Sequence, residues 1–365
     1  GIVNLYSREY YKLCKSRLKE GGMVSHWIPL HHLSEDDFRM LVSTFVSVFP
    51  HSTMWYTKWD AIMIGSNERL SIDFENLKER LNNKKIQESL KEIGMSNPFQ
   101  LLSTFMMDED DLHKFIDGVP IVTDNNPYVE FTAPRIHHIG TSIKGRNLLN
   151  MLKYRKPVTG VLSGMPLYSS LRGEAEAISN DEFLAEFTLS RKNEILRSAQ
   201  NDMRRARNDS SQGFLEEIEK YFNSYTYFLK GQVSVNDNSL KDAVYSFKKA
   251  VDINNENSDA RHELINLGIN SIYRILSTGE IDKGFELINE CMGLDRDMEF
   301  TPQLHNLRGL LFLSKKDIKR AANEFEYAIT LDGKYFSPYL NLGSIYTYYE
   351  PDMLKALEYY NKGLE

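Results

Sequence analysis

Residues 321–328 read AANEFEYA, and residues 243–250 read AVYSFKKA. In both stretches a small residue is followed four positions later by a phenylalanine, and three positions after that by a second alanine. Steps of four and three residues bring all three side chains onto one face of a helix. The two stretches therefore predict helices that pack in the same way.

The same spacing occurs twice more, in sets that begin 41, 37 and 35 residues after one another. These offsets are close to the repeat length of about 34 residues found in helical-hairpin arrays. Three of the sets are preceded, twelve or thirteen residues earlier, by a glycine: Gly231, Gly309 and Gly343. These glycines predict a first helix in each of the three hairpins. The four sets are Ala243, Phe247, Ala250; Gly284, Ile288, Cys291; Ala321, Phe325, Ala328; and Ala356, Tyr360, Gly363.

Residues 214–365 resemble the tetratricopeptide repeat (TPR) family in this spacing, with looser agreement in residue identity and a stretched second repeat. The resemblance implies a right-handed superhelix whose concave face binds a protein or peptide. The alternative is that the hairpins only pack against the N-terminal region or form a homodimer. No groove-lining residue can be singled out from the sequence.

Residues 1–66 predict a helix, a strand, a helix and two further strands. Ser7 and Ser34 are suited to cap the helices, and Pro29 closes a β-prone run at 23–28 that is typical of a buried strand. The runs 51–58 and 61–65 are separated by a turn short enough for a β-hairpin. This order predicts the closing portion of an α/β sheet.

Residues 67–135 predict short charged helices that end in a turn and a β-prone run at 129–132. The acidic cluster 108–111 could serve acid–base catalysis or bind a metal, but acidic residues also favour the start of a helix, and we prefer that explanation. Residues 136–213 predict a helical connector. Its basic segment 191–207 is either a patch for an acidic partner or, as we prefer, a solvated helix face, and a domain boundary is expected at 208–213.

Two stretches resemble spermidine synthase-like proteins: residues 4–30, which include NLYSREYY, and residues 123–131, TDNNPYVEF. The resemblance implies the class I methyltransferase fold, whose seven-stranded sheet closes in an antiparallel hairpin. It also implies a transfer of an aminopropyl group from decarboxylated S-adenosylmethionine, as co-substrate, to an amine such as putrescine. The two β-prone runs at 51–58 and 61–65 fit that ending.

Two departures limit this resemblance. No two glycines are separated by a single residue, so the G-x-G turn that lets a backbone approach a nucleotide is missing. The catalytic aspartate of the family lies upstream of the stretch that begins at Gly1. We therefore expect the chain to start inside a domain, to contain no catalytic residue or cofactor of its own, and to be inactive alone.

The matched motifs supply five candidate residues for binding substrate or co-substrate: Tyr6, His26, Trp27, Asp124 and Tyr128. Tyr6 and Trp27 would wall the pocket, although aromatic residues at such spacings are more often core. His26 stands where the family commonly has an amide; it could donate to adenosine or to the amine, or be a hydrogen-bonded histidine at a strand end. Asp124 has a structural alternative as a turn residue.

Composition excludes several classes of protein. The formal charge of −7 and the pI near 5.8 argue against nucleic acid as the partner, and two cysteines exclude a disulfide scaffold or a Cys-based zinc site. No histidine spacing predicts a metal site, and no apolar run is long enough to span a bilayer. We expect a cytoplasmic location for this chain; the parent protein's localisation stays open, because larger family members often carry transmembrane helices.

The expected fold is therefore α/β followed by all-α: a partial Rossmann-like, methyltransferase-type sheet with a helical extension, then a TPR-like α-solenoid. The expected function is a portion of a spermidine synthase-like aminopropyltransferase that carries a protein-interaction module. The alternative is a non-catalytic TPR scaffold with a degenerate α/β domain.

Overall fold

The computed structural model describes residues 5–57, 59–93, 95, 97–136, 142–163 and 210–364. The chain divides into two compact units, one running to Asn255 and the other beginning at Glu256. The division thus differs from the boundary predicted at 208–213. The basic segment 191–207 and much of the connector 136–213 lie outside the described residues.

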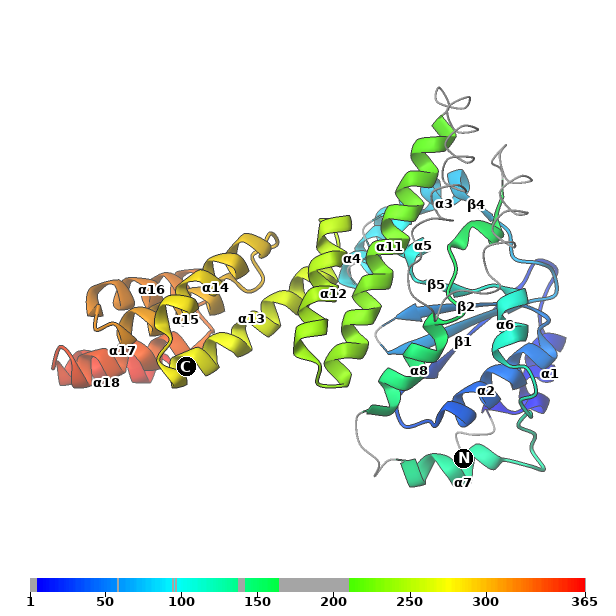
Figure 1. Ribbon diagram of the computed structural model, residues 1–365, viewed down its shortest axis with the longest axis horizontal. Coiled ribbons are helices and arrows are strands. Elements are labelled where there is room, and N and C mark those ends of the chain that lie inside the picture. The colour runs from blue at the N-terminus through cyan, green and yellow to red at the C-terminus, as the bar shows by residue number, and fades with distance from the viewer. Residues whose placement is uncertain are drawn as a thin grey trace, which may run out of the picture. The chain divides into compact units, whose positions relative to one another are not determined.

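The N-terminal unit contains a small antiparallel sheet (Figure 1), and its strand order is β1-β3-β2-β5. β2 and β3 form the predicted hairpin, with His51 opposite Ser66 and Thr57 opposite Asp60, so this prediction is confirmed. β5 was not predicted; it pairs with β2 at the far edge. The elements that build this part are α1 (Arg8–Ser16), β1 (Met23–Pro29), α2 (Glu35–Val48), β2 (His51–Thr57), β3 (Asp60–Ser66) and β5 (Phe105–Met107).

Helices α1 and α2 begin where the capping residues predict. The Ser7 hydroxyl accepts a hydrogen bond from the backbone N–H of Tyr10, and the Ser34 hydroxyl accepts one from Asp37. α2 buries an apolar face against one side of the sheet, where Phe45 lies over Gly65 of β3. A side chain at Gly65 would collide with that ring, so this glycine allows α2 to lie close to the strand.

The prediction that β1 is a buried strand is wrong. Among the described residues β1 lies at the edge of the sheet and pairs with β3, from Met23 opposite Ser66 to Pro29 opposite Asp60. Only Ile28 within it is buried, and Met23 and Trp27 are 59% and 52% exposed. A short apolar run cannot by itself distinguish a central strand from an edge strand, because burial depends on which neighbours pair with it.

The rest of the unit is mostly helical, as expected. The acidic cluster starts a helix: Asp108 caps α6 and accepts from the backbone N–H of Asp111, which agrees with the structural explanation. The remaining elements are β4 (Ile72–Asp73), α3 (Phe74–Leu81), α4 (Lys84–Glu92), α5 (Pro98–Ser103), α6 (Glu109–Phe115), α7 (Tyr128–Ile136), α8 (Ser142–Leu152), η2 (Val158–Val161), β6 (Leu162–Ser163), α11 (Ser210–Asn236) and α12 (Leu240–Ile253).

Residues 129–132 were predicted to be a β-prone run, but they lie in the helix α7. Pro127 precedes this helix and suits its start, since proline has no N–H to leave unpaired there. The Thr132 hydroxyl donates to Asp37 of α2 at 2.6 Å, and Val129 is buried. The helix thus has a packing partner, whereas an isolated strand here would leave its backbone groups without a ladder.

The long helix α11 is part of the N-terminal unit. Its Tyr221 ring stacks on Phe99 of α5, with ring centroids 5.6 Å apart, and the Asn97 side chain donates to the Tyr221 hydroxyl at 2.9 Å. Farther along α11, Gln232 accepts a hydrogen bond from Tyr56 of β2. These contacts explain why the first predicted hairpin, α11 with α12, groups with the sheet rather than with the later hairpins.

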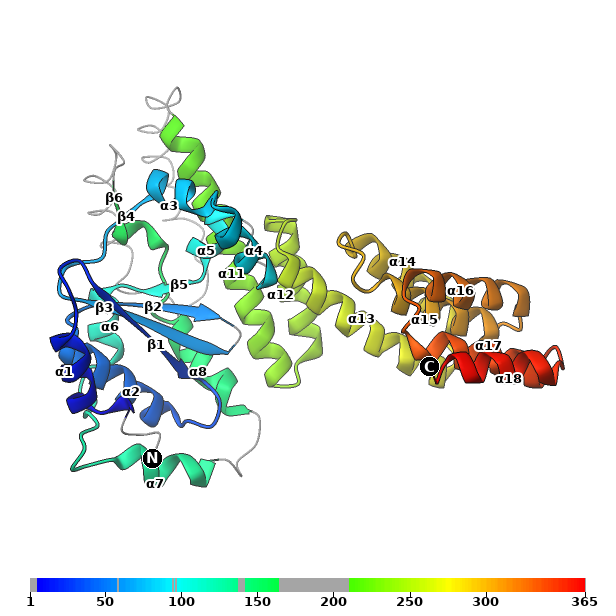
Figure 2. The ribbon, with the colours of Figure 1, turned by 180° about the vertical axis from the view of Figure 1, so that it is seen from behind.

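The C-terminal unit is helical throughout the residues described, and successive helices pack as pairs, as α17 and α18 do in Figure 2. The glycines of the first helices lie where the rings of the second helices cross them: a Cβ on Gly309 would be 2.5 Å from Phe325, and one on Gly343 would be 2.4 Å from Tyr360. In the stretched repeat, Gly268 of the first helix lies against Cys291 of the second helix. The role of Gly268 was not predicted. The helices are α13 (Ser258–Thr278), α14 (Ile281–Leu294), α15 (Thr301–Ser314), α16 (Ile318–Leu331), α17 (Phe336–Tyr348) and α18 (Met353–Lys362).

Candidate functional site

Three of the five candidate residues lie together where α1 meets β1. The ring of Tyr6 stacks on the imidazole of His26, with centroids 4.6 Å apart and planes 16° from parallel. The Tyr6 hydroxyl donates to the backbone oxygen of Trp27 at 3.2 Å. Two residues that sequence reasoning missed complete the cluster: Tyr10 and Tyr11 of α1, whose rings also face His26.

The aromatic cluster around His26 favours the neutral form of its imidazole. Burial lowers the pKa of His26, while burial and the nearby Tyr6 and Tyr10 raise the pKa of Tyr11 well above its ordinary value. The Tyr11 hydroxyl and His26 Nδ1 are 2.9 Å apart. When the hydroxyl donates to Nδ1, the imidazole carries its proton on Nε2 and can donate there to a ligand.

Trp27 points to the other face of the sheet from His26, because side chains alternate along a strand. Its cross-strand partner is Ile62 of β3, and Ile62 and Ile64 are only partly buried. Toward β2 and β5 this face is closed by a core that includes Trp55 and Phe105. Trp27 itself is 52% exposed and so forms an accessible aromatic wall on this face.

Asp60 is a candidate that the sequence did not reveal. It begins β3, opposite Pro29 of β1 and Thr57 of β2, and its Oδ1 is buried without a hydrogen-bond partner among the described residues. Burial raises the pKa of Asp60, partly offset by His31, and the carboxylate in turn helps to raise the pKa of Tyr6. A carboxylate beside the end of β1 can pair with a cationic amine.

Asp124 and Tyr128 lie apart from the His26 cluster. The backbone N–H of Asp124 donates to Glu9 at 3.0 Å, and the backbone N–H of Arg8 donates to the oxygen of Val122. These bonds fix the turn at 123–126 to the start of α1. Tyr128, at the start of α7, is 49% exposed. The structure therefore brings Tyr6, His26 and Trp27 together and places the other two candidates on neighbouring surface.

A second buried carboxylate belongs to the fold rather than to this cluster. Asp111 of α6 is 2% exposed, and its carboxylate lies 2.6 Å from Lys156 Nζ and 3.8 Å from Lys114 Nζ. Burial raises the pKa of Asp111 to about 6, against the opposing effect of Lys156. The protonated form is therefore favoured in the folded state relative to the unfolded chain.

This shift predicts a pH-dependent stability. Because the folded pKa is about 6 and the ordinary value is 3.8, the free energy of unfolding should fall as the pH rises between these values, by about 3 kcal/mol. Asp111→Asn should abolish that part of the dependence, as urea unfolding from pH 4 to 7 would measure. The matched control is Asp110→Asn, a side chain 58% exposed on the same helix, and it should keep the wild-type profile. A constant difference between wild type and Asp111→Asn across this range would contradict the prediction.

Among the residues that the structure describes, no group of three His, Cys, Asp or Glu side chains could hold a metal ion. In the same part of the chain, no helix combines the length and apolar character needed to cross a membrane.

Comparison with known proteins adds no assignment, since no family model matches the chain and no curated protein is significantly similar to it. A function for this chain therefore has to be inferred from its residues and their geometry.

Proposed function

We propose that the N-terminal unit is the closing portion of a spermidine synthase-like aminopropyltransferase domain and supplies one wall of its substrate pocket. The observation that carries this proposal is the topology at the end of the sheet. Of β1, β2 and β3, β3 comes last along the chain. It nevertheless lies between β1 and β2 in the sheet and runs antiparallel to both. The resemblance implies a sheet that closes in such an antiparallel hairpin.

The free edge of β1 supports the proposal further. In the described part of the chain, β1 has a strand neighbour on one side, β3. Proteins commonly protect an edge strand with charges, internal prolines or bulges, but residues 23–28 contain no charge and no proline. We infer that strands of a cofactor-binding half pair along β1 and so extend the sheet.

The residues at β1 suit the chemistry of such a pocket. Trp27 offers an exposed ring on which an adenine can stack. Asp60, which begins β3 opposite the end of β1, offers a carboxylate for the amine substrate. Aminopropyl transfer requires the amine nitrogen to be aligned with the carbon beside the sulfonium, and fixed groups of this kind provide that alignment.

The helical hairpins are proposed to be a TPR-like solenoid that binds a protein or peptide. The contacts of Gly309 with Phe325 and of Gly343 with Tyr360 support this, because they repeat the same close helix crossing in successive pairs. The packing of α14 on α15 and of α16 on α17 joins the pairs into a stack.

The test is calorimetric titration with methylthioadenosine, the nucleoside product expected of this transfer. The present chain should bind it weakly or not at all, because it contains no glycine-rich turn. The protein encoded by the longest reading frame that includes these 365 codons should bind it, and Trp27→Ala should weaken that binding at least tenfold, about 1.4 kcal/mol.

The matched control is Tyr245→Ala on α12, since Tyr245 is 59% exposed but lies outside the His26 cluster. This variant should bind as the wild type does. Tight binding by the present chain, or equal affinity of the Trp27→Ala and wild-type proteins, would contradict the proposal.

The second candidate function is a non-catalytic scaffold. The observation that favours it is the covering of His26 by the rings of Tyr6, Tyr10 and Tyr11, which gives this histidine a packing role without any ligand. The scaffold predicts no nucleoside binding by either length of chain, so the same titration separates the two functions.

A further inference from the structure

The first helices of the pairs α15–α16 and α17–α18 carry almost no charge. α17 contains no charged residue and α15 contains one, Arg308, whereas α14 and α16 contain four each. Arg308 Nε lies 2.9 Å from a carboxylate oxygen of Glu324 on α16, so its charge is compensated there. The charges of these repeats therefore lie mainly on the second helices.

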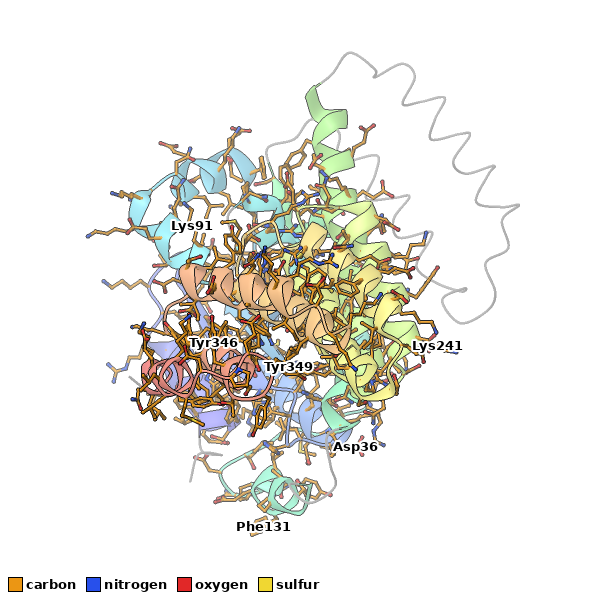
Figure 3. All side chains as sticks on the ribbon, turned by 90° about the vertical axis from the view of Figure 1, so that its left-hand side faces the viewer. Asp36, Lys91, Phe131, Lys241, Tyr346 and Tyr349 are labelled. Atoms are coloured by element: carbon orange, nitrogen blue, oxygen red, sulfur yellow. The ribbon has the colours of Figure 1, made fainter. Side chains whose placement is uncertain are left out.

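α15 and α17 each pack one side against their second helix. Gly309 of α15 lies against Phe325 of α16. On α17, the ring of Tyr346, labelled in Figure 3, is parallel to that of Tyr359 on α18, with centroids 5.7 Å apart. Another side of each helix carries residues at steps of three and four, and the two sets are 34 positions apart in the sequence. This set, which we call the first-helix face, consists of Gln303, Asn306 and Leu310 on α15 and Ser337, Leu340 and Ser344 on α17.

Neutral hydrogen bonds join the two halves of the first-helix face. The side chain of Asn341 donates to Asn306 Oδ1 at 2.8 Å, and the Asn306 amide donates to the Tyr335 hydroxyl at 3.4 Å. Asn306 is 1% exposed, whereas Leu340 is 36% exposed and the other four residues of the face are half-buried. The face therefore offers amide, hydroxyl and apolar groups to a partner, and no charge.

The lack of charge on the first-helix face indicates the chemistry of its partner. A charged side chain buried against this face would lose its hydration without gaining a counter-ion, which is unfavourable. An uncharged segment avoids that cost. Leu310 and Leu340 can contact its apolar side chains, and the hydroxyls of Ser337 and Ser344 can accept hydrogen bonds from its backbone N–H groups. The face and a neutral partner are thus complementary in charge.

We propose that the first-helix face binds an extended segment of a partner protein whose side chains in the contact are uncharged. The inference rests on the proposed function of the hairpins as a solenoid that binds a protein or peptide, and it adds the class of peptide bound. It is independent of both candidate functions of the N-terminal unit, because the residues of the face belong to the C-terminal unit.

Selection of phage-displayed random peptides on the full chain tests the proposal. The enriched peptides should contain few Asp, Glu, Lys or Arg residues. As synthetic peptides they should bind with an affinity that changes less than about twofold between about 50 and about 500 mM sodium chloride, since no ion pair is screened.

Two variants place a carboxylate on the face, one on each helix. Gln303→Glu and Leu340→Asp should each weaken binding of the selected peptides by about tenfold or more, with an unchanged circular dichroism spectrum. The matched control is Asn323→Asp, which makes the same amide-to-carboxylate change as Gln303→Glu at an exposed position of α16. This variant should bind as the wild type does.

The possible results separate the inference from the function on which it rests. Enriched peptides rich in acidic or basic residues, or an affinity that falls steeply with salt, would overturn the inference and leave peptide binding by the hairpins in place. Equal binding by the wild type, Gln303→Glu and Leu340→Asp would also overturn it, since the peptide would then bind elsewhere. A selection that enriches no peptide would contradict the peptide-binding function itself, and the inference with it.

Discussion

Phe325→Ala is expected to destabilise the C-terminal unit by about 4 kcal/mol, the usual range for deleting a buried phenylalanine. Phe325 is fully buried between α15 and α16, against Gly309, and belongs to the core formed with Ala321, Leu342 and Ile345. Alanine there would leave a cavity at the closest point of the helix pair. The neighbouring backbone can close it little, since Gly309 already brings the two helices as near as the ring allows.

The three tryptophans make this prediction measurable, because Trp27, Trp55 and Trp59 all lie in the N-terminal unit. Urea unfolding followed by far-ultraviolet circular dichroism should show an earlier helical transition in Phe325→Ala, while tryptophan fluorescence should be unchanged. Tyr327→Ala is the matched control, an aromatic residue of the same helix that is 50% exposed, and should cost about 1 kcal/mol or less. Equal losses in the two variants would show that Phe325 does not support the crossing.

Arg155→Ala is expected to destabilise the N-terminal unit by about 3 to 4 kcal/mol. The buried guanidinium donates to the backbone oxygens of Ser103 and Phe222, at 2.6 and 3.2 Å, and to the hydroxyl of Thr226. It also lies 4.1 Å from the centre of the Phe222 ring. Alanine would leave the buried Ser103 oxygen without this donor, and it would remove the guanidinium that bridges α5 to α11.

Tryptophan fluorescence during urea unfolding measures this effect, because it reports the N-terminal unit. Arg155→Met should cost less than Arg155→Ala, since methionine fills the space and removes the penalty of a buried charge, which already lowers the pKa of Arg155 to about 9. Lys153→Ala, at an exposed neighbour, should stay within about 0.5 kcal/mol of wild type. A loss below about 1 kcal/mol for Arg155→Ala would show that the other contacts of α11, such as those of Tyr221 and Gln232, hold this helix without Arg155.

Periodicity and capping residues predicted much of this fold because they act within one or two turns of chain. Ser7 and Ser34 cap helices through bonds to N–H groups three residues away. The hairpin of β2 and β3 follows from two β-prone runs and a short turn. The four-and-three spacing identified the faces of the later helices, and Gly268 escaped notice because the stretched repeat moves it away from its expected position.

Features that depend on distant parts of the chain could not be predicted in this way. β5 is three residues long and exists through its pairing with β2. The sequence of β1 is typical of a buried strand. The strand is exposed because, among the described residues, it pairs with β3 alone. The contact of Tyr6 with His26 needs α1 to fold back over β1, and the burial of Asp60 needs Pro29 and Thr57 on either side.

The central claim is that β1, with the exposed ring of Trp27, forms one wall of an aminopropyltransferase pocket. The measurement that tests it most directly is transfer of the aminopropyl group from decarboxylated S-adenosylmethionine to putrescine or spermidine, followed by mass spectrometry, for the present chain and for the longest reading frame that contains it. The account predicts transfer by the longer protein, loss of at least tenfold in Trp27→Ala, and none by the present chain. Transfer by the present chain alone, or none by the longer protein, would contradict it.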